Sequence, residues 1–111
     1  MKPHLHSLKD SRAIAAAKQY GSSHPSRLIT MVKRANGLEI SRTAFIASRV
    51  IGGAVERNRC RRRLRERMRN LSHGLKPGWD LLLIARRPLL EASAKDVDDG
   101  LENLLKNAGL L

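Results

Sequence analysis

Aromatic residues and cysteine are scarce in this sequence. Only Tyr20, Phe45 and Trp79 are aromatic among 111 residues, which is too few for a surface that binds nucleic acid mainly by stacking bases. The single Cys60 excludes an internal disulfide and is typical of a reducing cytoplasm. The length predicts one domain over residues 1–111 with one modest core.

Long apolar segments are also lacking. No run of about 18 apolar residues occurs, so a membrane-spanning helix is not expected. The stretch from Met1 to Lys9 has no apolar segment of the kind found in secretion signals. We therefore expect a cytoplasmic protein with no membrane partner and no obligate protein partner.

Acidic residues are outnumbered. The chain has 22 Lys and Arg against 10 Asp and Glu, a formal net charge of +12. Such a surplus favours a polyanionic partner, above all nucleic acid. A metal-dependent nuclease would need converging carboxylates, but Asp80 at a strand end and Asp96, Asp98 and Asp99 in a later helix do not resemble a set. We expect no catalytic residue, metal site or bound cofactor in this chain.

The positive charge is concentrated between Arg49 and Arg69, where nine residues are arginine and only Glu56 and Glu66 are acidic. On a helical wheel, the apolar residues of this segment fall on one narrow side, which predicts an amphipathic helix seated on a core. These apolar residues are Cys60, Leu64, Met68 and Leu71.

The polar side of this predicted helix carries a continuous stripe. Its spacing of i, i+4, i+7 and i+11 is suited to following a phosphate backbone, and two further arginines flank it. The stripe consists of Asn58, Arg62, Arg65 and Arg69, flanked by Arg57 and Arg61. Helix propensity does not explain Asn58. Gly52 and Gly53 precede the helix, and Gly53 can act as its N-cap.

The order of elements predicts an α+β fold, a single-domain two-layer sandwich ordered α-β-β-β-α-β-α. The first helix covers Ala13 to Gln19, with Ser7 and Asp10 resembling a capping box. An edge segment follows at 21–26. Strands are expected at 27–33 and 38–50, paired as a hairpin through the turn dipeptide Asn36-Gly37.

The second half of the chain contains a strand and a helix. Residues 79–85 form a nearly continuous apolar run, which is typical of a buried central strand. Ser93 and Asp96 resemble a capping box, and helical apolar spacing then continues to Ala108 before Gly109.

The run from Ile51 to Glu66 resembles the signature of the bacterial ribonuclease P protein family. It contains Gly-x-Ala-Val, then Arg57-Asn58-Arg59, two basic residues after Cys60, and Arg65-Glu66. Weaker similarities are Ser48-Arg49, the strand ending in Ala85-Arg86, and the carboxyl end from Gly109 to Leu111.

The resemblance implies a left-handed βαβ crossover through the arginine-rich helix, although parallel crossovers are usually right-handed. It also implies an accessory subunit of an endoribonuclease that matures the 5′ end of tRNA. The catalytic RNA subunit would hold the active site and its Mg²⁺, and the protein would bind the 5′ leader of precursor tRNA in a cleft between its first helix and the sheet.

Transferred residue by residue, the resemblance makes the arginine helix the contact with the catalytic RNA and places Ser48 and Arg49 near the leader cleft. Together with the stripe, the predicted RNA-binding residues are Ser48, Arg49, Arg57, Asn58, Arg59, Arg61, Arg62, Arg65 and Arg69. Three positions depart from the family, because Ile14, Lys18 and Val32 stand where aromatic residues usually line the cleft.

Two other functions compete with this interpretation. A small ribosomal or other structural RNA-binding protein would share the charge but need no leader cleft. A DNA-binding basic helix is less well supported, since neither dimerising heptads nor a helix-turn-helix pair accompany it.

Overall fold

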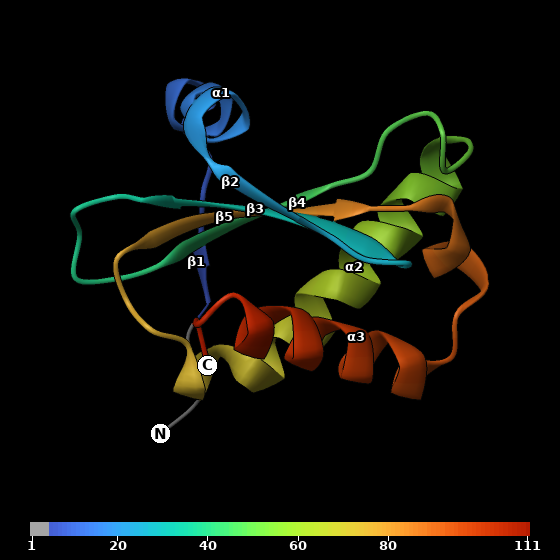
Figure 1. Ribbon diagram of the computed structural model, residues 1–111. Helices are drawn as coiled ribbons and strands as arrows, with labels where there is room; N and C mark the ends of the chain where they lie inside the picture. Colours follow the sequence, from blue (N-terminus) through green and yellow to red (C-terminus); the bar gives the residue numbers. More distant parts are fainter. Residues whose placement is uncertain (1–4) are drawn as a thin grey trace.

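The computed structural model describes residues 5–111, which form one five-stranded sheet and three α-helices (Figure 1). In chain order the elements are β1 (His6–Ser7), α1 (Ser11–Tyr20), β2 (Ser22–Pro25), β3 (Ile29–Ala35), β4 (Arg42–Ile46), α2 (Ala54–Leu71), the 3-10 helix η1 (Ser72–Gly74), β5 (Trp79–Ala85), the 3-10 helix η2 (Arg87–Glu91) and α3 (Ala94–Asn107). The α+β class and the predicted order are confirmed, with the short β1 as an addition.

The apolar strand β5 lies at the centre of the sheet, whose order is β1-β4-β5-β3-β2. It pairs antiparallel with β3 and parallel with β4. The predicted hairpin between β3 and β4 is therefore wrong, because β5 lies between them. The turn at Asn36-Gly37 exists, with Gly37 at φ 69°, but it separates two strands that do not pair.

The connection from β4 through α2 to β5 joins two parallel neighbours (Figure 1). It is left-handed, against the usual preference. Strand β4 is also shorter than predicted, since residues 38–41 and 47–50 lie outside it. The strand therefore ends at Ile46, whereas the predicted strand continued to Val50.

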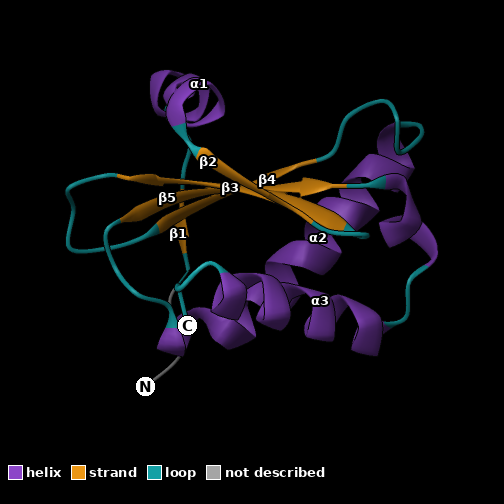
Figure 2. Cartoon of the chain, in the orientation of Figure 1, coloured by secondary structure: helices purple, strands orange, loops and turns teal. Residues whose placement is uncertain are grey.

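The helices cover the two faces of the sheet unequally. Helix α1 alone lies on one face, while α2 and α3 lie on the other (Figure 2). The larger core lies under α2 and α3 and includes Leu81 and Leu83 of β5. A smaller core under α1 contains Ala17, Val32 and Leu82. Because α1 spans only part of its face, the rest stays open beside it.

Two of the three α-helices begin after a residue whose side chain accepts a hydrogen bond from a free backbone N–H group, and the third begins after a glycine. Ser93 caps α3, accepting a hydrogen bond from the Asp96 amide at 3.1 Å, as predicted. The predicted role of Ser7 in a capping box is wrong, because Asp10 is the N-cap of α1 and accepts a hydrogen bond from the Arg12 amide; the helix begins at Ser11, two residues before the predicted Ala13. Gly53 is the N-cap of α2 and offers no side chain.

Asp80 is a structural carboxylate. It is buried at the start of β5, where both its oxygens accept hydrogen bonds at 2.8 Å from the guanidinium of Arg42 on β4. The Asn36 amide donates to it at 3.0 Å. The hydrogen bond that the Arg42 guanidinium donates to Asp80 raises the pKa of Arg42. The network joins β4 and β5 to the loop that follows β3, and it commits Asp80 to holding the sheet together.

Candidate RNA-binding surface

Helix α2 is divided sharply into a buried and an exposed side. Cys60, Leu64 and Met68 are fully buried and Leu71 is partly buried, as the helical spacing predicted. These residues fix the rotation of α2 against the sheet, so the remaining positions face outward. Burial raises the pKa of Cys60, and the nearby Arg63, Arg59 and Arg61 oppose that rise.

The predicted RNA-binding residues lie mainly on the outward side of α2. Exposed are Ser48, Arg49, Asn58, Arg59, Arg62, Arg65 and Arg69, whereas Arg57 and Arg61 are half-buried. Asn58 accepts a hydrogen bond from the guanidinium of Arg61, which orients that side chain along the helix. The stripe is thus a contiguous cationic surface of the kind that binds phosphates without reading sequence.

Two arginines of α2 serve the protein itself. Arg63 donates hydrogen bonds to the carbonyl oxygens of Leu89 at 2.8 Å and Ala92 at 2.5 Å, and so fastens α2 to η2. Arg67 lies 3.5 Å from Asp98 of α3. Neither was among the predicted RNA-binding residues. The basic run therefore combines structural arginines with outward ones.

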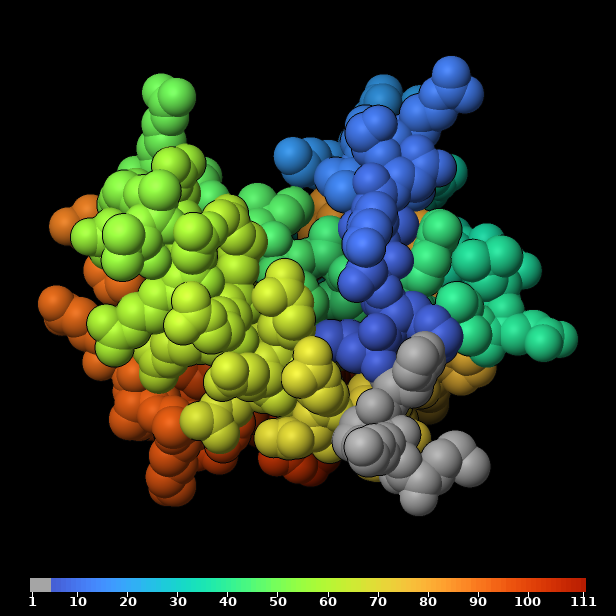
Figure 3. Space-filling view, turned by 180° about the vertical axis from the view of Figure 1, so that it is seen from behind, coloured from blue at the N-terminus to red at the C-terminus, as the bar shows by residue number. Residues whose placement is uncertain are grey.

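A cleft opens between α1 and α2 along strand β4. Figure 3, seen from behind, shows α1 and the segment before it separated from α2 by a hollow with β4 at its base. Its walls carry the cations Lys9, Lys18 and Arg65, its apolar lining includes Ile14 and Ile46, and no acid lines it. Its volume is about 370 Å³. The cleft is therefore cationic and aliphatic, and it suits an extended anionic chain.

Arg65 belongs to both the stripe and the cleft. Its guanidinium lies 5.4 Å from the centroid of the Phe45 ring, a cation–π contact that holds the arginine at the edge of the cleft. The cleft and the outward face of α2 therefore form one connected surface. Sequence reasoning missed Lys9 and Phe45 as cleft residues, since they come from segments far apart in the chain.

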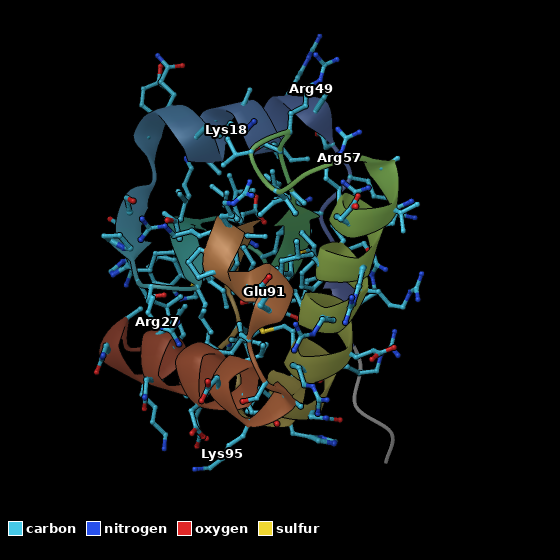
Figure 4. All side chains as sticks on the ribbon, turned by 90° about the vertical axis from the view of Figure 1, so that its right-hand side faces the viewer. Lys18, Arg27, Arg49, Arg57, Glu91 and Lys95 are labelled. Atoms are coloured by element: carbon cyan, nitrogen blue, oxygen red, sulfur yellow. The ribbon has the colours of Figure 1, made fainter. Side chains whose placement is uncertain are left out.

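Of the three positions where the family usually has aromatic residues, two line the cleft and one does not. Ile14 and Lys18 line the cleft, as expected. Val32 is buried in the small core with Ala17 and does not line it. Ser48 and Arg49 lie in the loop between β4 and α2, and Figure 4 shows Arg49 and Lys18 at the same edge of the molecule.

Neither a metal centre nor a membrane segment is found in the described part of the chain. Within residues 5–111, no three side chains of the His, Cys, Asp and Glu types gather in a way that could hold a metal ion. None of the described helices combines the length and the apolar character needed to cross a bilayer.

Comparison with known proteins points to one family. The profile of the family named Ribonuclease P matches residues 2–109. The ribonuclease P protein component of Dehalococcoides mccartyi is 36% identical, over 94% of this chain and 90% of its own length. That of Caldanaerobacter subterraneus is 33% identical, over 99% and 95%.

Solved structures agree with this relationship. The RNase P protein of Thermotoga maritima superposes with a TM-score of 0.83 at 27% identity, covering 92% of this chain and 96% of that one. The Staphylococcus aureus RNase P protein shares the fold with a TM-score of 0.85 at 23% identity, covering 96% and 98%. Nothing in these comparisons favours a ribosomal-type protein.

Proposed function

The chain belongs to the ribonuclease P protein family, and from this premise we propose that its cleft binds the 5′ leader of precursor tRNA while the outward face of α2 binds the catalytic RNA. The family membership itself makes the chain the accessory protein subunit of an endoribonuclease ribonucleoprotein in tRNA processing. The proposal concerns which surface meets which RNA.

The observation that carries the proposal is the continuity of two cationic surfaces at Arg65. A leader and a catalytic RNA are both polyanions, and they repel each other unless cations lie between them. A protein with one cationic cleft and one cationic helix face, joined at Arg65, can bind both and reduce that repulsion. The cleft holds a single strand, and the helix face holds a folded RNA.

The chemistry of the cleft supports binding with little sequence preference. Lys9, Lys18 and Arg65 can contact phosphates of any leader. Phe45 is half-buried with a guanidinium over its ring, and Ile14 and Ile46 offer aliphatic contact. Stacking of leader bases therefore contributes less here than phosphate contact, and affinity for the leader should fall steeply with salt.

We further propose that Mg²⁺ and the cleavage chemistry belong to the RNA subunit. Asp80, the one buried carboxylate among residues 5–111, is engaged by Arg42 and Asn36. The acids of α3 lie in a helix outside the cleft lining. The role of this chain is then to position RNA, and the reaction needs the partner.

The test is cleavage of precursor tRNA by a bacterial ribonuclease P RNA at low Mg²⁺, with and without this protein, and with the protein alone. We expect correct 5′ processing to be stimulated only when both are present. Substrates with a full leader and with a one-nucleotide leader separate the two surfaces, because only the former can occupy the cleft. Equal stimulation of both substrates would contradict leader binding, and cleavage by the protein alone would contradict catalysis by the RNA.

A further inference from the structure

Two valines at the start of α2 project into solvent without an apolar partner. Val50 is 67% exposed and Val55 is 78% exposed, and they flank Gly52-Gly53 on either side of the turn into the helix. Isolated exposed apolar residues are common on proteins. This valine pair is unusual because it stands within the most strongly charged segment of the chain.

The backbone of the turn holds the valine pair in place. The Ile51 amide donates to Ser48 at 3.1 Å, and the Ile51 side chain is buried. The Arg87 guanidinium donates to the Val50 carbonyl at 3.2 Å, which ties the turn to η2. Gly52 has a φ of 146°, a conformation that favours glycine. Because the backbone of this turn is already ordered in the free protein, binding there costs little further conformational entropy.

The charges around the valine pair indicate the nature of the partner. Arg49 adjoins Val50, Arg57 and Arg59 follow Val55, and Figure 4 shows Arg49 and Arg57 at the same end of the molecule. Glu56 is the only acid between residues 47 and 65. A partner that approaches this end must be anionic, yet phosphates cannot cover valine methyl groups. In RNA, the faces of unpaired bases and riboses are the apolar surfaces that can.

We propose that Val50 and Val55 pack against unpaired nucleotides of the RNA subunit, and so supply an apolar contact between the phosphate contacts of the neighbouring arginines. The inference rests on the proposed function, because it assumes that α2 faces that RNA. An apolar contact favours places where bases are unstacked, which are loops and bulges rather than regular helix. The valine pair would thus direct a sequence-independent cationic surface toward a particular kind of RNA structure.

The test measures affinity for a bacterial ribonuclease P RNA, without substrate, over a range of salt concentrations. We expect Val50→Ala and Val55→Ala each to weaken binding about fivefold, with the salt slope unchanged because no charge is removed. Val50→Thr and Val55→Thr keep the side-chain shape and should weaken binding in the same direction. Leu38→Ala is the matched control, since Leu38 is 45% exposed on the loop between β3 and β4 and should have no effect.

Several results would overturn the inference. A variant with both Val50→Ala and Val55→Ala that binds within about twofold of the unmodified chain would show that the valines make no contact with the RNA. A change of the salt slope as large as that of Arg62→Ala would show that they act through the arginines. Loss of self-association in sedimentation, seen only in the valine variants, would identify a protein interface instead. If the unmodified chain neither binds the RNA nor stimulates cleavage, the proposed function fails as well, and the valine variants are not needed to show it.

Discussion

Helices α2 and α3 lie on the same face of the sheet and present opposite charges to solvent. Helix α2 carries eight arginines and two glutamates over 18 residues. Helix α3 carries two lysines and four acids over 14 residues. Both are attached in the same way, by fully buried apolar side chains such as Leu64 in α2 and Leu101 in α3.

The comparison separates what folding requires from what binding requires. Burial of one apolar side attaches either helix to the sheet, so the composition of the outer side is free to vary. Eight arginines on one helix repel each other and weaken the folded state unless an anion neutralises them. Helix α3 shows that this fold does not need such a surface. The cationic exterior of α2 is therefore not needed for folding, which supports the proposal that it binds RNA.

The acids of α3 also orient the molecule. A polyanion is attracted to α2 and the cleft, and it is repelled by the first turn of α3 with Asp96 and by Asp98 and Asp99 beyond it. The ion pair between Arg67 and Asp98 marks the boundary between the two surfaces. If α2 and the cleft bind RNA as proposed, this charge difference favours their side of the protein over the α3 side.

Removing charge from each helix in turn tests this comparison most strongly. Arg62→Ala with Arg65→Ala should weaken binding of the RNA subunit by about ten- to a hundredfold and flatten the salt slope by about two, since two exposed phosphate contacts are lost. The melting temperature should stay nearly unchanged. Affinity measured against salt concentration, with a thermal melt of each variant, gives both quantities.

The matched control is on α3. Asp99→Asn with Glu102→Gln removes two acids whose pairs with Lys95 and Lys106 are exposed and worth little. RNA affinity should stay equal or rise slightly. Equal losses of affinity from the two double variants, or a loss of stability as large as the loss of binding from the α2 variant, would contradict the division of roles.

The second test compares adjacent arginines within α2. Arg63→Ala should lower the free energy of unfolding by about 2 kcal/mol, because the carbonyls of Leu89 and Ala92 lose their donor. Arg62→Ala should not lower it, since Arg62 is exposed and no contact holds it to the protein surface. Urea denaturation measures both free energies of unfolding. Under conditions in which both variants are fully folded, Arg62→Ala should weaken RNA binding more than Arg63→Ala does. Similar stabilities for the two variants would mean that Arg63 does not hold η2.

The caps of the two helices give a smaller difference. Ser93→Ala should destabilise the protein by about 1 kcal/mol, because the Asp96 amide loses its acceptor. Gly53→Ala should behave differently, since Gly53 supplies no side-chain cap and has ordinary extended backbone. Its effect should be a few tenths of a kcal/mol, limited by the approach of a new Cβ to the Glu56 carboxylate at 3.1 Å. Thermal denaturation of the two variants measures both losses. A larger loss of stability for Gly53→Ala than for Ser93→Ala would contradict this account of the caps.

Much of this structure follows from local sequence patterns. Spacing of 3.6 residues identified the buried side of α2 from Cys60 to Met68, and Ser93 with Asp96 marked the start of α3. An uninterrupted apolar run identified the central strand β5. Each of these signals is contained within a few consecutive residues, so a single segment is enough to read it.

The pairing of strands and the make-up of the cleft could not be predicted in this way. Strand β5 lies between β3 and β4 although it is more than thirty residues further along the chain, and no local turn signal records that. The left-handed crossover was expected only from the family resemblance. The difference between Arg62 and Arg63 depends on the position of η2, which sequence periodicity does not contain.

The smallest predicted effect concerns the buried side of α2, where Cys60 lies inside a helix that is cationic outside. Burial raises the pKa of the thiol more than the surrounding arginines lower it. In the folded protein it should therefore react slowly with a thiol reagent at mildly alkaline pH, and it should react rapidly in urea. Because its pKa is higher folded than unfolded, its contribution to stability is complete below the unfolded pKa and is lost as pH rises through the folded pKa. Urea denaturation at neutral and alkaline pH should thus show that the free energy of unfolding falls slightly more with rising pH in the unmodified protein than in Cys60→Ala, which lacks the thiol. Rapid modification of the folded protein would mean that the arginines control this thiol, and that the two sides of α2 are less separate than their burial indicates.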